Sequence, residues 1–139
     1  MISIRDHVYA VRKILVDAGW RTHVGDVRES TPKMPYVLVK MPPGTPKTDT
    51  LGPYGDELKY FQPITVVADS ADTLLYVIDD VRASLDGAVP EVKGRVAEPL
   101  RIGYSSGLFT DDQVNLTGGG HPAYAVDMWT MCTHDNMVR

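Results

Sequence analysis

The sequence predicts an α+β domain: a mixed or antiparallel β-sheet with two α-helices packed on one face. Three observations lead to this prediction. Two segments, at 4–18 and 71–85, repeat apolar residues at the spacing of a helix. Most other segments carry the β-branched and aromatic residues of strands. The resulting order, α-β-β-β-α-β-β-β, joins strands through hairpin-like loops, so repeating β-α-β units are not expected.

Length and composition indicate one domain. The chain has 139 residues and a mass of 15.3 kDa, enough to bury a core without metals or disulfides. Hydrophobic residues make up 43% and charged residues 23%, which excludes a disordered chain, a collagen-like repeat and a coiled coil. We expect the domain to span 1–133 and a flexible tail to follow at 134–139.

Charge and cysteine content narrow the function classes. The net charge is −4 and no run of Lys or Arg exceeds two residues. This argues against binding of nucleic acid through neutralisation of its phosphates. A single cysteine, Cys132, excludes an intrachain disulfide and is expected to pack in the core. The sequence has neither a signal-peptide pattern nor an apolar run of about 18 residues. We therefore expect a protein that works in the cytoplasm, or in an assembly built there, without a membrane.

The first half of the chain begins with a helix. Ser3 is the expected N-cap, Asp6 favours the first turn, and Gly19 ends the helix. Strands are expected at 20–27 and 36–41, the second with the sequence YVLVKM. The apolar stripe of this first helix consists of Ile4, Val8, Val11, Leu15 and Ala18.

Segment 41–57 is rich in glycine and proline and predicts a long loop between the second and third strands. It holds four prolines and three glycines in 17 residues and shows no periodicity of helix or strand. Loops longer than about 12–15 residues in compact domains are usually functional or disordered. We expect an extended arm that touches a neighbouring molecule and is poorly ordered in a free subunit. The third strand, 58–68, contains Pro63, which predicts a sheet edge or a bulge there.

The second half begins with a helix that Ser70 caps and Gly87 ends. A strand bent at Pro99 is expected at 95–104, a short polar strand at 112–117, and a glycine turn at 118–120. The last strand, 123–133, is apolar on much of both faces, which predicts a central position or an outer face covered by a partner.

One motif suggests catalysis. Gly103-Tyr104-Ser105-Ser106-Gly107 matches G-x-S-x-G, the nucleophile elbow of serine hydrolases, and acidic and histidine residues follow it. The elbow needs a helix after the serine, but the next residues lack a helical pattern, so a turn is favoured. A small hydrolase using Ser105 is kept as a remote alternative.

Other candidate sites are weaker. Gly118–Gly120 precedes a proline and a strand, whereas phosphate loops feed a helix. Asp79 and Asp80 are adjacent on a helix and therefore diverge by about 100°. The histidines lack metal-ligand spacing; they are His7, His23, His121 and His134. The sequence thus predicts no enzyme, with no catalytic residue, cofactor or metal site.

Large apolar residues in the expected loops and tail, together with Trp129 of the last strand, are the candidate interface. Such side chains either tuck onto the domain's own core or meet another subunit. The candidates are Leu51, Tyr54, Leu108, Phe109, Trp129 and Met137.

The layout as a whole resembles a known family. A short N-terminal helix leads to Pro35-Tyr36-Val37; a long loop then precedes the aromatic-Gln-Pro-Ile-Thr-Val-Val run at 61–67. A helix of the type S-x-D-x-L-x-x-x-I-D-D-V-R-x-x-L-D-G follows, and a YAVDMWTM strand closes the domain. This pattern, over roughly residues 3–133, resembles the tail terminator proteins of long non-contractile-tailed (siphovirus-type) bacteriophages, especially those of actinobacterial hosts.

The resemblance implies a virion structural role. It implies a homo-oligomeric ring, expected to be a hexamer, at the neck of the tail, assembled in the host cytoplasm. The ring would cap the tube of major tail protein, stop its growth and join the tail to the head–tail connector, while DNA passes through the lumen without specific binding. Head-completion, connector and minor tail proteins of the neck share this size and style and remain the alternative.

Overall fold

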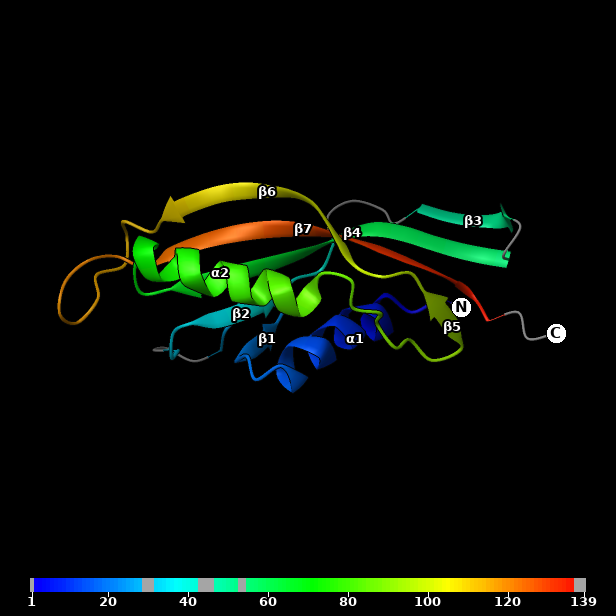
Figure 1. Cartoon of the computed structure of the whole chain (residues 1–139), viewed down its shortest axis with the longest axis horizontal. Coiled ribbons are helices and arrows are strands. Elements are labelled where there is room, and N and C mark those ends of the chain that lie inside the picture. Colours follow the sequence, from blue (N-terminus) through cyan, green and yellow to red (C-terminus); the bar gives the residue numbers. More distant parts are fainter. Residues whose placement is uncertain (1, 29–31, 43–46, 53–54, 137–139) are drawn as a thin grey trace.

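The computed structural model describes residues 2–28, 32–42, 47–52 and 55–136. Two helices pack on one face of a curled mixed sheet, which has seven strands within the described residues, so the predicted α+β class is confirmed (Figure 1). The elements in chain order are α1 (Ile4–Asp17), β1 (Thr22–Val24), β2 (Tyr36–Val39), β3 (Lys47–Gly52), β4 (Gly55–Ala68), α2 (Ala71–Leu85), β5 (Arg95–Ala97), β6 (Arg101–Thr110) and β7 (Ala123–Asp135).

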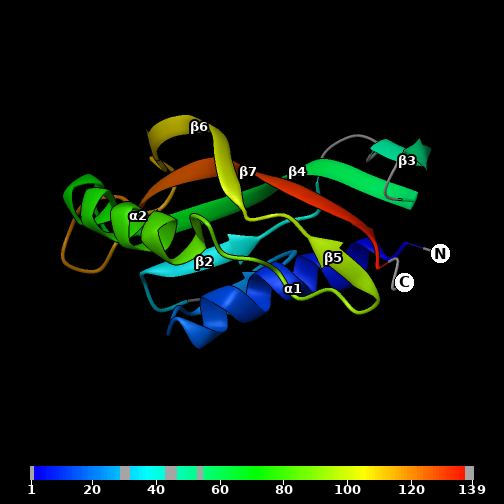
Figure 2. The same ribbon diagram turned by 45° about the vertical axis from the view of Figure 1, so that its right-hand side comes forward.

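Strands β4 and β7 form the spine of the sheet. They pair antiparallel from Glu57↔His134 to Ala68↔Ala123. Strands β2 and β3 both pair with β4, and strands β5 and β6 both pair with β7. Strand β1 lies beyond β2 and is parallel to it. The β3–β4 hairpin extends past α2 at the end of the molecule that carries β5 (Figures 1 and 2).

The core lies between the two helices and one face of the sheet (Figure 2). Alternate residues of β7 face it, from Ala123 to Thr133, and Trp129 is its largest fully buried side chain. Leu15 of α1 and Leu85 of α2 are fully buried against this face. Of the two alternatives predicted for the last strand, the central position is confirmed, because β7 pairs with β4, β5 and β6. None of the described helices is both long and apolar enough to cross a membrane.

The predicted helix ends are confirmed. The hydroxyl of Ser3 accepts the N–H of Asp6 at 3.2 Å, and that of Ser70 accepts the N–H of Thr73 at 3.1 Å. Gly19 follows α1 with φ of +94°, a left-handed conformation that favours glycine. These caps form between residues three positions apart, so local sequence is sufficient to specify them.

Pro63 lies in the middle of the sheet, and the register of β4 against β7 is regular through it, so the predicted edge position or bulge is wrong. Its carbonyl accepts the N–H of Lys40, just past the end of β2, at 3.3 Å. An antiparallel pair of this kind exchanges two bonds, and proline cannot supply the second. The side chain of Gln62 replaces it, because its Nε2 donates to the carbonyl of Lys40 at 2.5 Å. A buried amide therefore allows proline in a central strand.

Replacing Gln62 with methionine is expected to destabilise the fold by about 1–3 kcal/mol, because the carbonyl of Lys40 loses its donor without a large change in volume. The double variant Q62M/P63A restores a main-chain N–H at position 63 and should lose less than the sum of the single changes. Urea unfolding of wild type, Q62M, P63A and Q62M/P63A measures both effects. Strictly additive losses would contradict the proposed substitution of one donor by the other.

The arm and the following strands differ from the prediction. Residues 47–52, expected within a loop, form β3, which pairs with β4 from Lys47↔Lys59 to Gly52↔Gly55. The expected strand 95–104 divides into β5 and β6, and the expected strand 112–117 consists of turns and irregular chain. The first strand is shorter than 20–27, and the last continues to Asp135, into the expected tail.

The second part of β6, 105–110, extends beyond the expected strand 95–104, because two irregularities hide its alternation. Its register against β7 shifts between Ile102 and Tyr104 and again between Ser105 and Leu108. Gly107, at φ of +82°, lies in the second shift. Such bulges insert residues that break the period of two and increase the local bend of a strand. The pairing with β7, distant in sequence, decides the strand.

Candidate interaction surfaces

The face of the sheet opposite the helices carries a row of aromatic residues, here called the aromatic surface: Phe61, Tyr104, Phe109 and Tyr124. Paired residues of antiparallel strands point to the same face. Phe109 pairs with Tyr124, and Tyr104 pairs with Met128, both of which alternate with the core-facing residues of β7. The aromatic surface therefore lies on the helix-free face.

Contacts between the rings organise this surface. Phe61 meets Tyr104 edge-on with centroids 5.5 Å apart, and Phe109 stacks on Tyr124 at 5.6 Å. A Cβ placed on Gly103 would stand 2.6 Å from the ring of Phe61, so glycine is needed there for the ring to approach β6. Phe61, Tyr104 and Phe109 remain 43%, 56% and 48% exposed. Exposed aromatic rings held in place are typical of protein interfaces.

The residues predicted as an interface do not lie on one common surface. Leu108 and Phe109 are exposed, at 40% and 48%, but lie in β6 rather than in a loop. They point to opposite faces, because Leu108 pairs with buried Ala125 and Phe109 with Tyr124. Only Phe109 belongs to the aromatic surface.

Trp129 is 1% exposed and packs in the core, so placing it in an interface was wrong. The apolar run of β7 on both faces did not tell which face the helices cover. Leu51 belongs to β3, where only its backbone is described. Tyr54 and Met137 lie outside the described residues. Phe61 and Tyr104 lie within the expected strands 58–68 and 95–104, but only the pairing of β4 and β6 with β7 places both on the helix-free face.

The G-x-S-x-G motif does not form a nucleophile elbow. Ser105 and Ser106 lie inside β6, and the described chain continues as strand to Thr110 and then as turn. The hydroxyl of Ser105 accepts the N–H of Gly107, and that of Ser106 accepts the N–H of Val126 from β7. These serines satisfy the backbone of a bulged strand. The predicted turn at this motif is also replaced by strand.

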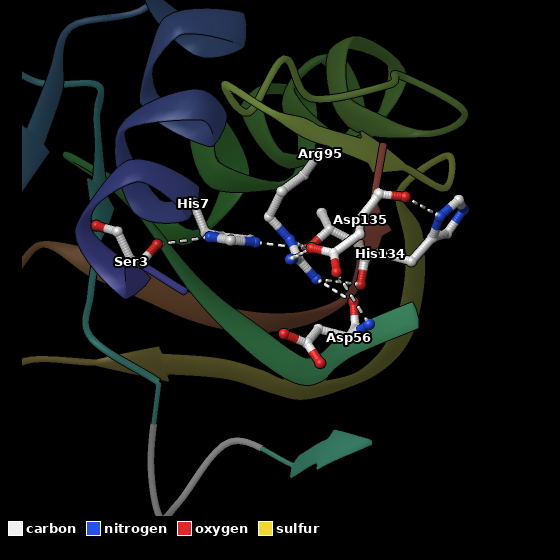
Figure 3. Close-up of polar contacts among 7 residues, drawn as sticks. Ser3, His7, Asp56, Arg95, His134 and Asp135 are labelled. Atoms are coloured by element: carbon white, nitrogen blue, oxygen red, sulfur yellow. Dashed lines mark hydrogen bonds and ion pairs between the residues drawn. The ribbon is translucent and has the colours of Figure 1, made fainter. Parts of the chain in front are cut away.

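A polar network joins α1, β4, β5 and β7 at the end of the sheet near the hairpin (Figure 3). Its centre is Arg95, whose side chain is 7% exposed. The guanidinium donates to the hydroxyl of Thr133 at 2.8 Å and to its carbonyl at 2.9 Å. It also donates to the carboxylate of Asp135 at 3.0 Å and to the carbonyl of Asp56 at 2.8 Å. One side chain thus connects three strands.

His7 connects α1 to the same network. Its Nδ1 lies 2.6 Å from the carbonyl of Ser3 and its Nε2 lies 2.6 Å from the hydroxyl of Thr133 (Figure 3). Since a carbonyl only accepts, Nδ1 carries the proton, and the neutral ring accepts at Nε2 from Thr133. Burial lowers the pKa of His7, and the charge of Arg95 lowers it further, although the bond to Ser3 opposes the shift. The neutral ring is the form that the fold prefers.

Acidification is therefore expected to destabilise the fold through His7. The lowered pKa means that the unfolded chain binds a proton more readily than the folded chain, so stability is present above pH 6.5 and falls as pH decreases through the folded pKa. The variant H7Q replaces the imidazole with an amide of similar reach that does not titrate. Its free energy of unfolding should therefore depend less on pH. Urea unfolding at pH 5, 6 and 7.5 measures the two slopes. Equal slopes for H7Q and wild type would contradict this role.

A second buried polar contact joins α2 to β7. The carboxylate of Asp127 is 1% exposed and forms two parallel bonds with Arg82, Nε to Oδ2 at 2.8 Å and Nη2 to Oδ1 at 2.9 Å. The hydrogen bond to Asp127 raises the pKa of Arg82. Such forked pairs fix geometry as well as charge. The pair sets the position of α2 on the sheet.

The described residues carry no group of three or more His, Cys, Asp or Glu side chains that could hold a metal ion. The predicted burial of Cys132 is confirmed, and burial is the main cause that raises the pKa of its thiol to about 11. A thiol with that pKa is a poor nucleophile at neutral pH.

Comparisons with known proteins extend the fold assignment. No family model matches the chain, and no curated protein matches it either. The fold is similar to that of a chain in the virion of a native gene transfer agent particle, with a TM-score of 0.59 and 14% identity over 93% of this chain and 92% of that chain. A second solved chain is similar with a TM-score of 0.55 and 15% identity, over 100% of this chain and 99% of that chain. The likeness covers the entire α+β fold rather than one motif.

Proposed function

We propose that this chain is a virion structural protein, a tail terminator that forms a ring on the end of a phage tail tube. The observation that carries the proposal is the end-to-end likeness in fold to a chain of a gene transfer agent virion. The sequence pattern of the tail terminator family, which covers roughly residues 3–133, supports the same role independently. In this role the chain acts through surface complementarity with itself, the tail tube protein and the head–tail connector.

The exposed surfaces suit an assembly subunit. The aromatic surface offers rings that are already held in place on the helix-free face. Strand β6 pairs only with β7 among the described strands, and all ten of its residues are exposed. An open strand edge is a template for pairing with another chain. We assign the aromatic surface and the β6 edge to contact with the tube or the connector.

The β3–β4 hairpin is the proposed arm. It extends beyond α2 at the end of the sheet that carries β5 (Figure 1), where its β4 strand still pairs with β7. We expect segment 41–57 to be cut quickly by a protease in the free subunit and to be protected once the ring assembles on a tube. Gel analysis of timed digests of both forms measures the difference. Equal cleavage in the two states would remove the arm from the proposed interface.

Tube growth tests the proposed function directly. Adding the purified chain to polymerising subunits of the cognate tail tube protein should yield shorter tubes with a ring at one end in electron micrographs. The variant F61S/Y104S, altered on the aromatic surface, should leave tube length as in the absence of the chain. V114S, which changes an apolar residue of similar exposure (42%) outside the surface, is the matched control. Tubes of unchanged length with wild-type chain would overturn the proposal.

Antibody labelling of intact particles separates the tail terminator from the neck alternatives. A terminator lies directly on the last ring of tube protein and remains on tails that lack heads. A head-completion or connector protein would label heads that lack tails.

A further inference from the structure

The two helices carry strips of opposite charge at matching spacing, exposed except at Arg12, which is half-buried. On α1 the strip, here called the basic strip, is Arg5, Tyr9, Arg12 and Val16. On α2 the acidic strip is Asp72, Tyr76, Asp79 and Ala83. Both follow i, i+4, i+7 and i+11, so each presents charge, aromatic ring, charge and small apolar residue along one line of its helix. In both strips the two charges lie about 10 Å apart along the axis.

The two arginines of the basic strip lie beside the ring of Tyr9 and not, within the described residues, beside a carboxylate. The guanidinium carbons of Arg5 and Arg12 lie 4.5 Å and 5.9 Å from the ring centroid of Tyr9. Neither arginine forms an ion pair within the described part of the chain, whereas Lys13, on the neighbouring flank of α1, pairs with Asp17. Tyr9 is 39% exposed. Two positive charges are thus held beside an accessible ring.

The acidic strip points away from the sheet. Its helix buries Leu74, Val77, Ile78, Val81 and Leu85 on the opposite side. Tyr76 is 72% exposed and Leu75 beside it is 58% exposed, so two large side chains adjoin the aspartates on the accessible side of α2. Asp72 and Asp79 form no ion pair within the residues that the structure describes.

The two strips cannot meet within one molecule. Asp6, on the other exposed flank of α1, lines a hollow with Val92 and Lys93 of the segment that follows α2. Ser84 of α2 accepts a bond from Trp20 just after α1 at 3.3 Å, so a side of α2 distinct from the acidic strip faces α1. The basic strip therefore lies on the flank of α1 turned away from α2. Complementary strips on two different surfaces of one subunit are what a head-to-tail contact requires.

We propose that the basic strip of one copy docks on the acidic strip of the next copy, as the contact that repeats around a ring. This inference rests on the proposed ring-forming function. The occupant of each strip is thus a second copy of this chain. Charge complementarity carries the assignment: two arginines meet two aspartates at the same interval, with tyrosines and small apolar residues between them.

Charge reversal tests this contact. R5E/R12E makes both strips acidic, and D72K/D79K makes both basic, so each variant alone should associate at least about tenfold more weakly than wild type. Mixed one to one, they should reassemble, since every contact again joins opposite charges. Alternating copies close only into rings of even number. The matched control, K13E/D17K, swaps an ion pair on the neighbouring flank of α1 and should assemble as wild type does.

Light scattering gives the mass of each assembly, and circular dichroism checks that each variant folds. Full recovery of ring mass in the mixture is the expected result. If wild type forms rings and the reversed variants form them equally well, or if the mixture fails to reassemble, the strips do not meet and the inference is overturned while the proposed function stands. A wild type that stays monomeric even on tail tubes overturns the proposed function as well.

Discussion

Replacing Arg82 with alanine is expected to lower the free energy of unfolding by about 3 kcal/mol. The change leaves the carboxylate of Asp127, which is 1% exposed, without its forked partner. Removing one member of a buried pair costs about 3–5 kcal/mol. We place this case at the lower end of that range because Arg82 is itself 36% exposed, so water can reach part of the gap. Chemical denaturation at pH 7 measures the loss.

The pair of variants R82M and R82M/D127L separates charge from packing. The single change should destabilise nearly as much as alanine, because the stranded carboxylate is the main cost. The double change removes that carboxylate and should recover most of the loss, since well-packed apolar residues often replace buried ion pairs without penalty. A double variant no more stable than R82M would show that the pair is not the source of the effect.

Replacing Arg95 with methionine is the second large change, expected to cost about 3 kcal/mol. Methionine fills much of the same space but gives up all the bonds that join Thr133, Asp135 and Asp56. The carbonyls and the hydroxyl that lose their donor lie at the junction of β4, β5 and β7. A buried polar group without a hydrogen-bond partner costs about 1–3 kcal/mol of stability. Denaturant titration measures the total.

A second readout identifies the cause. The charge of Arg95 lowers the pKa of His7, so R95M should raise that pKa, and NMR titration of the ring detects the change. R95K retains the charge but not the fork and should leave the pKa of His7 nearer to the wild-type value while still losing stability. An unchanged pKa of His7 in R95M would contradict the electrostatic part of this prediction.

The same network explains why the end of the sheet was misjudged from sequence. His134 and Asp135 look like the start of a polar tail, yet β7 continues through both. Their backbone pairs with Glu57 of β4 and with β5, and the carboxylate of Asp135 meets Arg95. Each of these partners lies about 40 or more positions away along the chain. Local composition carries no signal of such pairings.

The candidate interface also depends on pairings between distant segments. Exposed apolar residues were sought in loops, and the aromatic surface arises instead from three strands that lie side by side. Leu108 and Phe109 are neighbours in sequence but point to opposite faces, since their pairing with β7 assigns one to each side. The two charged strips, by contrast, are readable from helical spacing alone once the helices are known.

Both helices, their caps and the α+β class are predictable from the sequence alone, because each depends on periodicity or on contacts within one turn. The last strand left two alternatives open, and its pairing with β4, β5 and β6 makes it central. Contacts between distant segments settle the remaining elements. Whether 47–52 and 105–110 become strands depends on partners far along the chain, and register shifts hide their alternation. Proline is tolerated in a central strand only because Gln62 reaches the carbonyl of Lys40, 22 positions away. Trp129 is core rather than interface because the two helices cover that face of β7, and the sequence of β7 alone does not tell which face they cover.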